Sequence, residues 1–228
     1  LEESELKDFI NKLRNNEIHG INVTVPFKNK VIKYLDKLSL EVETTGSVNT
    51  IYKNGDDIIG HNTDVAGFEL GLRHSKIDVL HKSILILGAG GVVPSIIYSL
   101  LSMGCKKIFL SNRTIEKAEN IKKKFNEIEV LKWGKIPDFD IVINATSVGL
   151  KDDSLDLDFK TKDKIFYDII YNPKETQFLK KAKENGNRIE NGMFMFIYQA
   201  NQSFSIWNNV IPKIDEEVLN LLGWLKLA

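Results

Sequence analysis

The feature that most restricts the fold of this chain is a short apolar segment that runs directly into a glycine-rich turn. Residues Ile84–Leu87 are all aliphatic, and Gly88-Ala89-Gly90-Gly91 follows at once. A continuously apolar run of this length is expected of a strand that is buried on both faces of a parallel sheet. An apolar helix is expected next, from Val92 to Met103. This order of strand, turn and helix is typical of a dinucleotide-binding sheet, although the third fingerprint position holds Val93 instead of glycine or alanine.

Strands and helices alternate beyond this unit, which predicts a parallel sheet with right-handed crossovers. Further strands are expected at residues 107–110, 130–131, 141–143 and 165–167. Helices are expected at residues 114–125, 176–184 and 193–207, and a last amphipathic helix at 215–225 after Pro212. The fold class is therefore α/β, with a Rossmann-like, doubly wound cofactor domain.

The N-terminal part has a different texture. It predicts helices at residues 3–14, 27–36 and 64–73, a strand at 20–25, and a hairpin of residues 48–52 and 58–61 around Asn54-Gly55. We place the domain seams near residues 64 and 191. Residues 1–63 and 192–228 then form an α/β substrate domain, with the C-terminal helices packed back on it, and residues 64–191 form the cofactor domain.

The composition of the chain excludes several classes of protein. The 31 lysines and arginines match the 31 aspartates and glutamates, so no basic field would attract nucleic acid or an anionic membrane. Cys105 is the only cysteine, which excludes an internal disulfide and a cysteine-cluster metal site and fits a reducing cytosol. No apolar run approaches the roughly 18 residues of a membrane span. We expect a cytoplasmic protein, monomeric or homodimeric, that binds a small molecule and no metal.

The end of the second strand of the cofactor domain indicates which nucleotide binds. An NAD enzyme usually carries an acidic residue there for the ribose 2′-hydroxyl. This chain has Asn112-Arg113-Thr114 instead, with Lys117 one helical turn later. Arg113 and Lys117 would attract a 2′-phosphate, and Asn112 and Thr114 can donate hydrogen bonds to it. A helix cap at Thr114 beside solvated basic residues is compatible with the same sequence. We predict NADP as the cofactor.

Two polar motifs precede the glycine turn. Asn22 and Thr24 share one face of the expected strand, and Lys28 follows Pro26. Asp64 ends the motif Asn62-Thr63-Asp64 at the start of a predicted helix. Taken alone, such a lysine is usually solvated and such a motif is usually a helix cap. Together, upstream of a cofactor turn, they favour a lysine and a carboxylate that handle the proton of a secondary alcohol.

These motifs and several others occur in the order found in shikimate dehydrogenases, and the chain resembles that family over nearly its whole length. The matching stretches are Gly20–Lys28, Ser47–Thr50, Gly60–Asp64, Leu87–Gly91, Asn112–Thr114, Asn144–Gly149, Asp168–Pro173 and Asn191–Met193 with Gln199. The resemblance implies reversible NADP-dependent reduction of 3-dehydroshikimate to shikimate, a step of aromatic amino acid and chorismate biosynthesis.

The resemblance also implies a role for individual residues. The catalytic pair would be Lys28 and Asp64. The substrate's hydroxyls or carboxylate would be held by Thr24, Asn49, Tyr171 and Gln199. NADP would be held by Gly88, Ala89, Gly90, Gly91, Asn112, Arg113, Thr114, Lys117, Thr146, Ser147, Gly192 and Met193.

The chain also departs from the family pattern. The family begins with a strand whose Ser-x-Ser element grips the substrate carboxylate, and this sequence starts downstream of that strand. Val92-Val93-Pro94 replaces the small or basic residues common after the glycines, and Phe194 stands where the family often has a second glycine, which would narrow the nicotinamide pocket. His61 beside Asn62 is a rival proton carrier, but the nearby lysine already serves that purpose.

Three alternatives stay open at this point. A related enzyme would also accept quinate, with NADP or NAD. A regulator would bind NADP without catalysis, which the presence of both Lys28 and Asp64 disfavours. A folate-linked dehydrogenase of similar plan is disfavoured by Asn62-Thr63-Asp64 and by Gln199.

Overall fold

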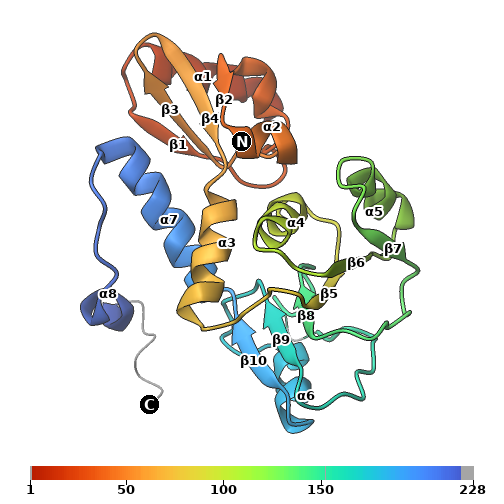
Figure 1. Ribbon diagram of the computed structural model, residues 1–228. Helices are drawn as coiled ribbons and strands as arrows, with labels where there is room; N and C mark the ends of the chain where they lie inside the picture. Colours follow the sequence, from red (N-terminus) through yellow and green to blue (C-terminus); the bar gives the residue numbers. More distant parts are fainter. Residues whose placement is uncertain (1, 152, 222–228) are drawn as a thin grey trace.

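The chain folds around two sheets that share no strand. The computed structural model describes residues 2–151 and 153–221. A four-stranded sheet has the order β1-β3-β4-β2, and a six-stranded sheet has the order β10-β9-β8-β5-β6-β7. In Figure 1 the smaller sheet lies at the top and the larger one below, with helices α3 (Thr63–His74) and α7 (Met193–Asn208) between them.

The smaller sheet is mostly antiparallel. Strand β3 pairs antiparallel with both β1 and β4, and the short β2 runs parallel to β4. The strands are β1 (Gly20–Asn22), β2 (Lys37–Leu38), β3 (Thr50–Asn54) and β4 (Asp57–His61). The helices of this region are η1 (Glu3–Glu5), α1 (Leu6–Arg14), η2 (Val31–Tyr34) and α2 (Leu40–Thr45). The predicted hairpin around Asn54-Gly55 is confirmed. The hydrophobic core of this region joins Ile10 and Leu13 of α1 to Ile51 and Ile58 of the sheet.

The predicted helix at residues 27–36 is wrong. Residues 25–30 form turns, and only Val31–Tyr34 are helical, as the 3-10 helix η2. The carbonyl of Lys28, which a helix would offer to residue 32, accepts a hydrogen bond from the amide of Val48 at 2.8 Å instead. Val31 is still buried in the core, so the apolar pattern was real, but a long-range backbone contact replaces the helical one.

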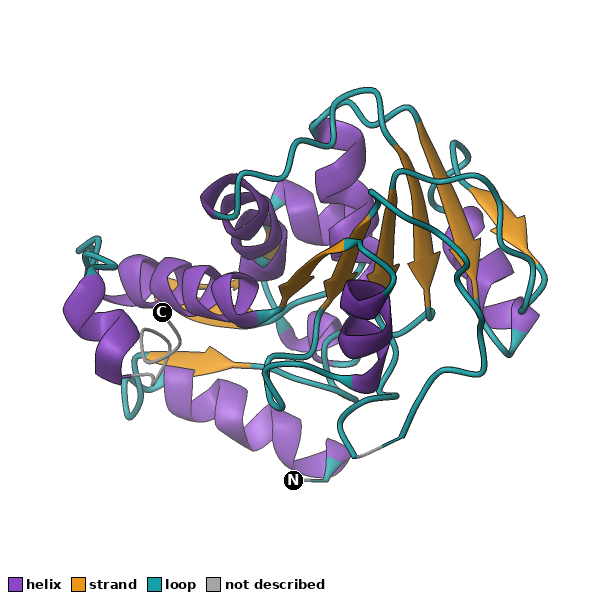
Figure 2. Cartoon of the chain, turned by 90° about the horizontal axis from the view of Figure 1, so that it is seen from below, coloured by secondary structure: helices purple, strands orange, loops and turns teal. Residues whose placement is uncertain are grey.

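The larger sheet is parallel throughout and covered on both faces. Its strands are β5 (Ser83–Leu87), β6 (Lys107–Ser111), β7 (Glu129–Leu131), β8 (Ile141–Asn144), β9 (Ile165–Asp168) and β10 (Arg188–Asn191). Ile84 and Ile86 face a cluster that includes α3 and α4 (Val93–Ser102), whereas Leu85 and Leu87 face α6 (Gln177–Glu184). Figure 2 shows helices on either side of these strands. Burial on both faces explains why the strands are apolar without alternation.

The order of the strands reverses at β5, which lies between β6 and β8. In doubly wound sheets a ligand binds in the crevice at the carboxyl ends of the strands at such a point. The Rossmann-like fold class is therefore confirmed. The sequence reading missed β2, α2 and the edge strand β10, which are short or rich in polar residues. The last predicted helix is present as α8 (Glu216–Leu221), and its continuation to residue 225 lies outside the described residues.

Candidate active site

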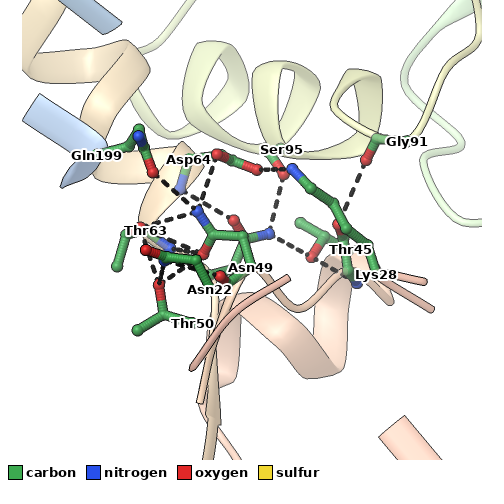
Figure 3. Close-up of polar contacts among 12 residues, drawn as sticks. Asn22, Lys28, Thr45, Asn49, Thr50, Thr63, Asp64, Gly91, Ser95 and Gln199 are labelled. Atoms are coloured by element: carbon green, nitrogen blue, oxygen red, sulfur yellow. Dashed lines mark hydrogen bonds and ion pairs between the residues drawn. The ribbon is translucent and has the colours of Figure 1, made fainter. Parts of the chain in front are cut away.

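The centre of the site is an ion pair between Lys28 and Asp64. Lys28 Nζ lies 2.5 Å from Asp64 Oδ2, and the two side chains are only 14% and 8% exposed. Charges this well shielded from water require a partner, because desolvation of a lone ion is costly. The structure thus brings together the two residues that the sequence motifs singled out, from the turn after β1 and the first turn of α3 (Figure 3).

Local structure fixes Asp64 at the start of α3. The side chain of Asn62 is the N-cap and accepts a hydrogen bond from the amide of Asp64 at 3.1 Å. A negative charge is favoured in the first turn of a helix by the helix dipole. The side-chain nitrogen Nδ2 of Asn62 also donates to Thr45 Oγ1 at 3.0 Å and to Ser95 Oγ of α4 at 2.9 Å. The cap that holds Asp64 is therefore hydrogen-bonded both to α2, beside the smaller sheet, and to α4, after the glycine turn.

Asn49 holds the other oxygen of the Asp64 carboxylate. Its Nδ2 lies 2.9 Å from Asp64 Oδ1, and its Oδ1 accepts a hydrogen bond from the amide of Thr63 at 2.7 Å. The same Nδ2 lies 3.4 Å from Gln199 Oε1. Both carboxylate oxygens of Asp64 thus have protein partners, and the carboxylate is held in one orientation.

A second layer of hydroxyl groups supports this arrangement. Ser203 Oγ of α7 lies 2.7 Å from Thr50 Oγ1 and 3.1 Å from Thr63 Oγ1. Asn22 Nδ2 donates to the same Ser203 oxygen at 3.2 Å. The sequence reading gave Ser203 no role. Its position four residues after Gln199, on the same helix face, is the signal that identifies it in retrospect.

Two glycines of α3 allow its backbone to come into direct contact with the backbone of α7. A Cβ on Gly67 would lie 2.8 Å from the amide nitrogen of Gln199, and one on Gly71 would lie 2.9 Å from that of Met195. Any larger side chain would push the helices apart. This close approach sets the position of Gln199 relative to Asp64 on the neighbouring helix.

These side chains surround a cavity of about 520 Å³, which reaches Val92, the residue after the glycine turn. All six residues expected to handle substrate or proton line it, namely Lys28, Asp64, Thr24, Asn49, Tyr171 and Gln199. Its other walls come from Asn22, Val23, Val92, Ile169, Gly192, Met195 and Phe196. The cavity therefore combines a charged pair, several amide and hydroxyl groups and an apolar side, as expected of a small-molecule site.

Tyr171 enters the cavity from the loop after β9. The buried carboxylate of Asp168 accepts hydrogen bonds from the amide of Ile170 at 3.0 Å and from Thr176 Oγ1 at 2.7 Å, so it brackets this loop. Asn144 Nδ2 donates to the same carboxylate at 3.1 Å. Burial raises the pKa of Asp168 to about 6. The bracket fixes the main chain that carries Tyr171.

At the start of α7, Met193 does not lie where the sequence places it, beside the cofactor's ribose and nicotinamide. Met193 packs in an apolar cluster with Ile197 and Leu219, and the cavity is lined by Met195 instead. The reason is helical geometry, since Met195 lies four residues before Gln199 and Met193 does not share that face. Phe194 was expected to narrow the nicotinamide pocket, but its ring stacks on His74 at 3.8 Å and is not among the residues that line the cavity.

The glycine turn falls into two kinds of position. Gly88 has a φ of +108°, and a Cβ there would lie 2.7 Å from the carbonyl oxygen of Ala145, so the protein itself requires glycine. A Cβ on Gly90 or Gly91 would approach its nearest neighbour only to 3.9 or 3.8 Å. The packing of the protein itself therefore does not require glycine at these two positions, which agrees with a backbone that a phosphate group approaches closely at the start of α4. Ala89 lies between Gly88 and Gly90 and packs against the core beneath.

The four predicted 2′-phosphate residues follow β6. Arg113, Thr114 and Lys117 are exposed, and Asn112 is half-buried with its Nδ2 donating to the carbonyl of Thr114 at 2.7 Å. Thr114 is the N-cap of α5 (Ile115–Lys122), but its side chain makes no capping hydrogen bond. Its hydroxyl and the two basic groups thus remain accessible to a phosphate.

The loop after β8 and the start of α7 complete the predicted cofactor residues. Thr146 Oγ1 donates to Asn144 Oδ1 at 2.7 Å, and its methyl group lies beside Gly88, whereas Ser147 is exposed. Gly192 lines the cavity, and a Cβ on it would overlap the carbonyl of Ile169. Packing therefore demands glycine at position 192 whether or not a nucleotide binds.

His61 lies outside this arrangement. It is absent from the residues that line the cavity, and its buried Nδ1 has no hydrogen-bond partner within the described part of the chain. Burial lowers its pKa. Cys105 is no better placed, because burial raises the pKa of its thiol to about 11 and so leaves it protonated near neutral pH. Among the described residues no cluster of acidic, histidine and cysteine side chains could hold a metal ion, and no helix is long and apolar enough to cross a membrane.

Comparison with known proteins agrees with this geometry. Residues 1–51 match the family model of the shikimate dehydrogenase substrate binding domain, and residues 71–151 match that of shikimate / quinate 5-dehydrogenase. A shikimate dehydrogenase (NADP+) of Pelagibacter ubique is 53% identical over 225 residues, which cover 97% of this chain and 85% of that protein.

Solved structures give the same result. A shikimate dehydrogenase in complex with NADP+ has a TM-score of 0.85 and 34% identity, covering 94% of this chain and 79% of that one. A shikimate 5-dehydrogenase of Listeria monocytogenes in complex with shikimate and NAD has a TM-score of 0.87 and 30% identity, covering 96% and 82%. The chain described here belongs to the shikimate dehydrogenase family.

Proposed function

We propose that this chain catalyses the reversible NADP-dependent reduction of 3-dehydroshikimate to shikimate. The observation that carries the proposal is the Lys28–Asp64 ion pair in the wall of a cavity that is also lined by Val92, the residue directly after the glycine turn. Residues 1–63 and 192–228 form the substrate domain and residues 64–191 the cofactor domain. The two separate sheets support this division.

Lys28 and Asp64 handle the hydroxyl proton. Oxidation of a secondary alcohol removes a proton from oxygen and a hydride from carbon, and bound NADP+ is the group that accepts the hydride. One N–H of Lys28 is directed to Asp64 Oδ2, which leaves the ammonium two further N–H groups for the substrate oxygen. In the oxidation direction Lys28 gives one proton to the carboxylate of Asp64 and takes up the hydroxyl proton, so the pair gains one proton. In the reverse direction the ammonium polarises the ketone and gives a proton to its oxygen, and Asp64 returns one to the lysine. Asp64, held by Asn49, orients the lysine.

The remaining polar residues of the cavity hold the other oxygens of the substrate. Thr24, Gln199 and Tyr171 offer hydroxyl and amide groups from three different segments. Asn49 already donates to Asp64, so its main contribution is to fix the carboxylate beside the substrate. Hydrogen-bonding groups on several sides of one cavity suit a ring that carries several hydroxyls.

The cofactor residues are assigned by position and charge. The backbone of Gly88–Gly91 and the start of α4 hold the pyrophosphate. Arg113 and Lys117 hold the 2′-phosphate, aided by Asn112 and Thr114. Thr146, Ser147, Gly192 and Met195 lie on the ribose and nicotinamide side, with Met195 in the place first expected for Met193. The absence of a packing requirement for glycine at position 90 and the exposure of Arg113 support this assignment.

A broader substrate range is the second candidate. The family model that matches residues 71–151 describes enzymes of shikimate or quinate, which share a ring with several hydroxyls. We place the enzyme in the cytoplasm, as a monomer or a homodimer. Cell fractionation and sedimentation of the purified protein test these two points.

The deciding experiment follows NADPH or NADH absorbance with shikimate and with quinate, each against NADP+ and NAD+. We expect the highest kcat/KM for shikimate with NADP+. Lys28→Met is the control that removes the proton carrier without altering the cofactor side. A folded protein that binds NADP+ but oxidises neither substrate would instead support the non-catalytic regulator.

A further inference from the structure

Phe196 forms part of the cavity wall beside Tyr171, and the two rings stack. Their centroids are 4.5 Å apart and their planes differ by 22°. Both side chains line the cavity, and both stay partly open to solvent, at 37% for Tyr171 and 38% for Phe196. Phe196 has no polar atom beyond its backbone. Its side chain therefore offers a ligand apolar contact only, and it acts on the hydroxyl groups of a ligand through the stacked Tyr171 ring or the water that it displaces.

The main chain below Tyr171 is held firmly, but the ring extends beyond that support. Asp168 brackets the loop through Ile170 and Thr176, and Asn191 Nδ2 donates to the carbonyl of Lys174 at 2.7 Å. These contacts fix the backbone and leave the side-chain torsions free. Because the hydroxyl lies at the far end of the ring, a change of rotamer would carry it to another part of the cavity.

Phe196 is well placed to restrict that rotation. It lies on α7, whose backbone meets that of α3 at Gly67 and Gly71, so its own position follows a firmly packed helix. Gln199 lies one turn further along the same helix and lines the same cavity. Offset aromatic pairs of this kind shift an equilibrium by about two- to tenfold beyond the burial of their area.

We propose that Phe196 is a positioning residue that holds the Tyr171 hydroxyl where it meets an oxygen of the substrate ring, and so sets the affinity for shikimate. The inference rests on the proposed function, because it takes shikimate as the ligand. It assigns Phe196 no part in proton or hydride transfer.

A double-mutant cycle tests the proposal. Phe196→Leu removes the stacked ring, Tyr171→Phe removes only the hydroxyl, and the third protein carries both changes. We expect Phe196→Leu to raise the KM for shikimate about two- to tenfold, while kcat and the KM for NADP+ change by less than about twofold. In the Tyr171→Phe background the same change should cost almost nothing further, since the hydroxyl that it positions is gone.

Two further variants separate positioning from general packing. Phe196→Tyr keeps a ring that can stack, so its KM for shikimate should equal that of the unaltered enzyme, unlike that of Phe196→Leu. Phe204→Leu alters a residue on the same helix that is 46% exposed and does not line the cavity, and it should change nothing. Shikimate affinity measured by calorimetry provides a readout that does not depend on turnover.

Additive losses in the double variant would overturn the proposal, because Phe196 would then act independently of the Tyr171 hydroxyl. A loss confined to kcat would also overturn it. If the unaltered enzyme neither oxidises nor binds shikimate, the proposed function fails and this inference fails with it. An active enzyme with additive losses would leave the proposed function intact and remove the inference alone.

Discussion

The polar wall around Lys28 and the segment around Arg113 differ in how far the protein itself satisfies their side chains. Lys28, Asp64 and Asn49 all have protein partners, and the hydroxyl of Ser203 bonds to Thr50 and Thr63, which contact Asn49. Arg113 and Lys117 are exposed instead. Proton transfer depends on exact placement of the groups before the substrate arrives, because correctly oriented groups avoid reorganisation during reaction. A charged cofactor needs mainly accessible donors of the right sign.

The largest expected effect tests the prearranged side of this comparison. Lys28→Met should lower kcat by about 10²- to 10⁴-fold, the usual contribution of a positioned acid–base group, while the Kd for NADP+ stays unchanged. Steady-state rates and cofactor titration measure the two quantities. Asp64→Asn should give a similar loss, and the double variant should lose little more, since groups that act as a unit are not additive. Near-normal turnover in Lys28→Met would contradict the assignment.

The second prediction concerns the exposed side. Arg113→Ala should weaken NADP+ binding by about 1.5–3 kcal/mol, because a charge-assisted contact to the 2′-phosphate is lost. NAD+ binding should hardly change, because NAD+ lacks that phosphate. Titration of both cofactors into the variant measures the difference, with Lys180→Ala, an exposed lysine of α6, as a control. An equal loss for both cofactors would show that Arg113 does not read the 2′-phosphate.

The third prediction contrasts Gly67 of α3, which lies behind the polar wall, with Gly90 of the glycine turn on the cofactor side. Gly67→Ala should destabilise the fold by about 1–3 kcal/mol, because its Cβ would press on the backbone of Gln199. Gly90→Ala should leave the melting temperature almost unchanged, because the nearest atom to its Cβ would be 3.9 Å away. It should weaken NADP+ binding, because the proposed pyrophosphate site lies against this backbone. Thermal denaturation and cofactor titration of both variants provide the test. A destabilised Gly90→Ala protein that still binds NADP+ normally would reverse this interpretation.

The smallest effect concerns His61. This residue precedes Asn62 in the chain but does not line the cavity, so we expect it to take no part in proton transfer. Burial lowers its pKa, so the folded protein takes up the proton less readily than the unfolded chain. Its contribution to stability is present above its ordinary pKa of about 6.5 and is lost as the pH falls below that value.

His61→Gln should therefore reduce the fall in melting temperature between about pH 7 and about pH 5 and leave kcat within about twofold. The raised pKa of Asp168, about 6, gives a slope of opposite sign. Asp168 is present in both proteins, so comparing them isolates His61. A folded but inactive His61→Gln enzyme would make the histidine a proton carrier after all.

Much of the larger domain followed from local pattern. Strands buried on both faces need apolar residues at every position, so β5, β8 and β9 were visible in the sequence within a residue of their bounds. The motifs also named all six residues that were expected to contact the substrate or its proton and that line the cavity. The helix expected at residues 27–36 failed because the carbonyl of Lys28 bonds to Val48, twenty residues away in the chain.

The order of strands and helices around the glycine turn, and the chemical types of the side chains near the site, could be predicted from the sequence. Those depend on short-range periodicity and on residue identity. The three-dimensional packing was needed to show that Asn49 holds Asp64 and that Ser203 bonds to Thr50 and Thr63. It was also needed to show that Met195 and Phe196 line the cavity while Met193 and Phe194 do not. The physical reason is that these contacts depend on the packing of α7 against α3. Two glycines set that packing at backbone distance, and no local pattern encodes which side of α7 then faces Asp64.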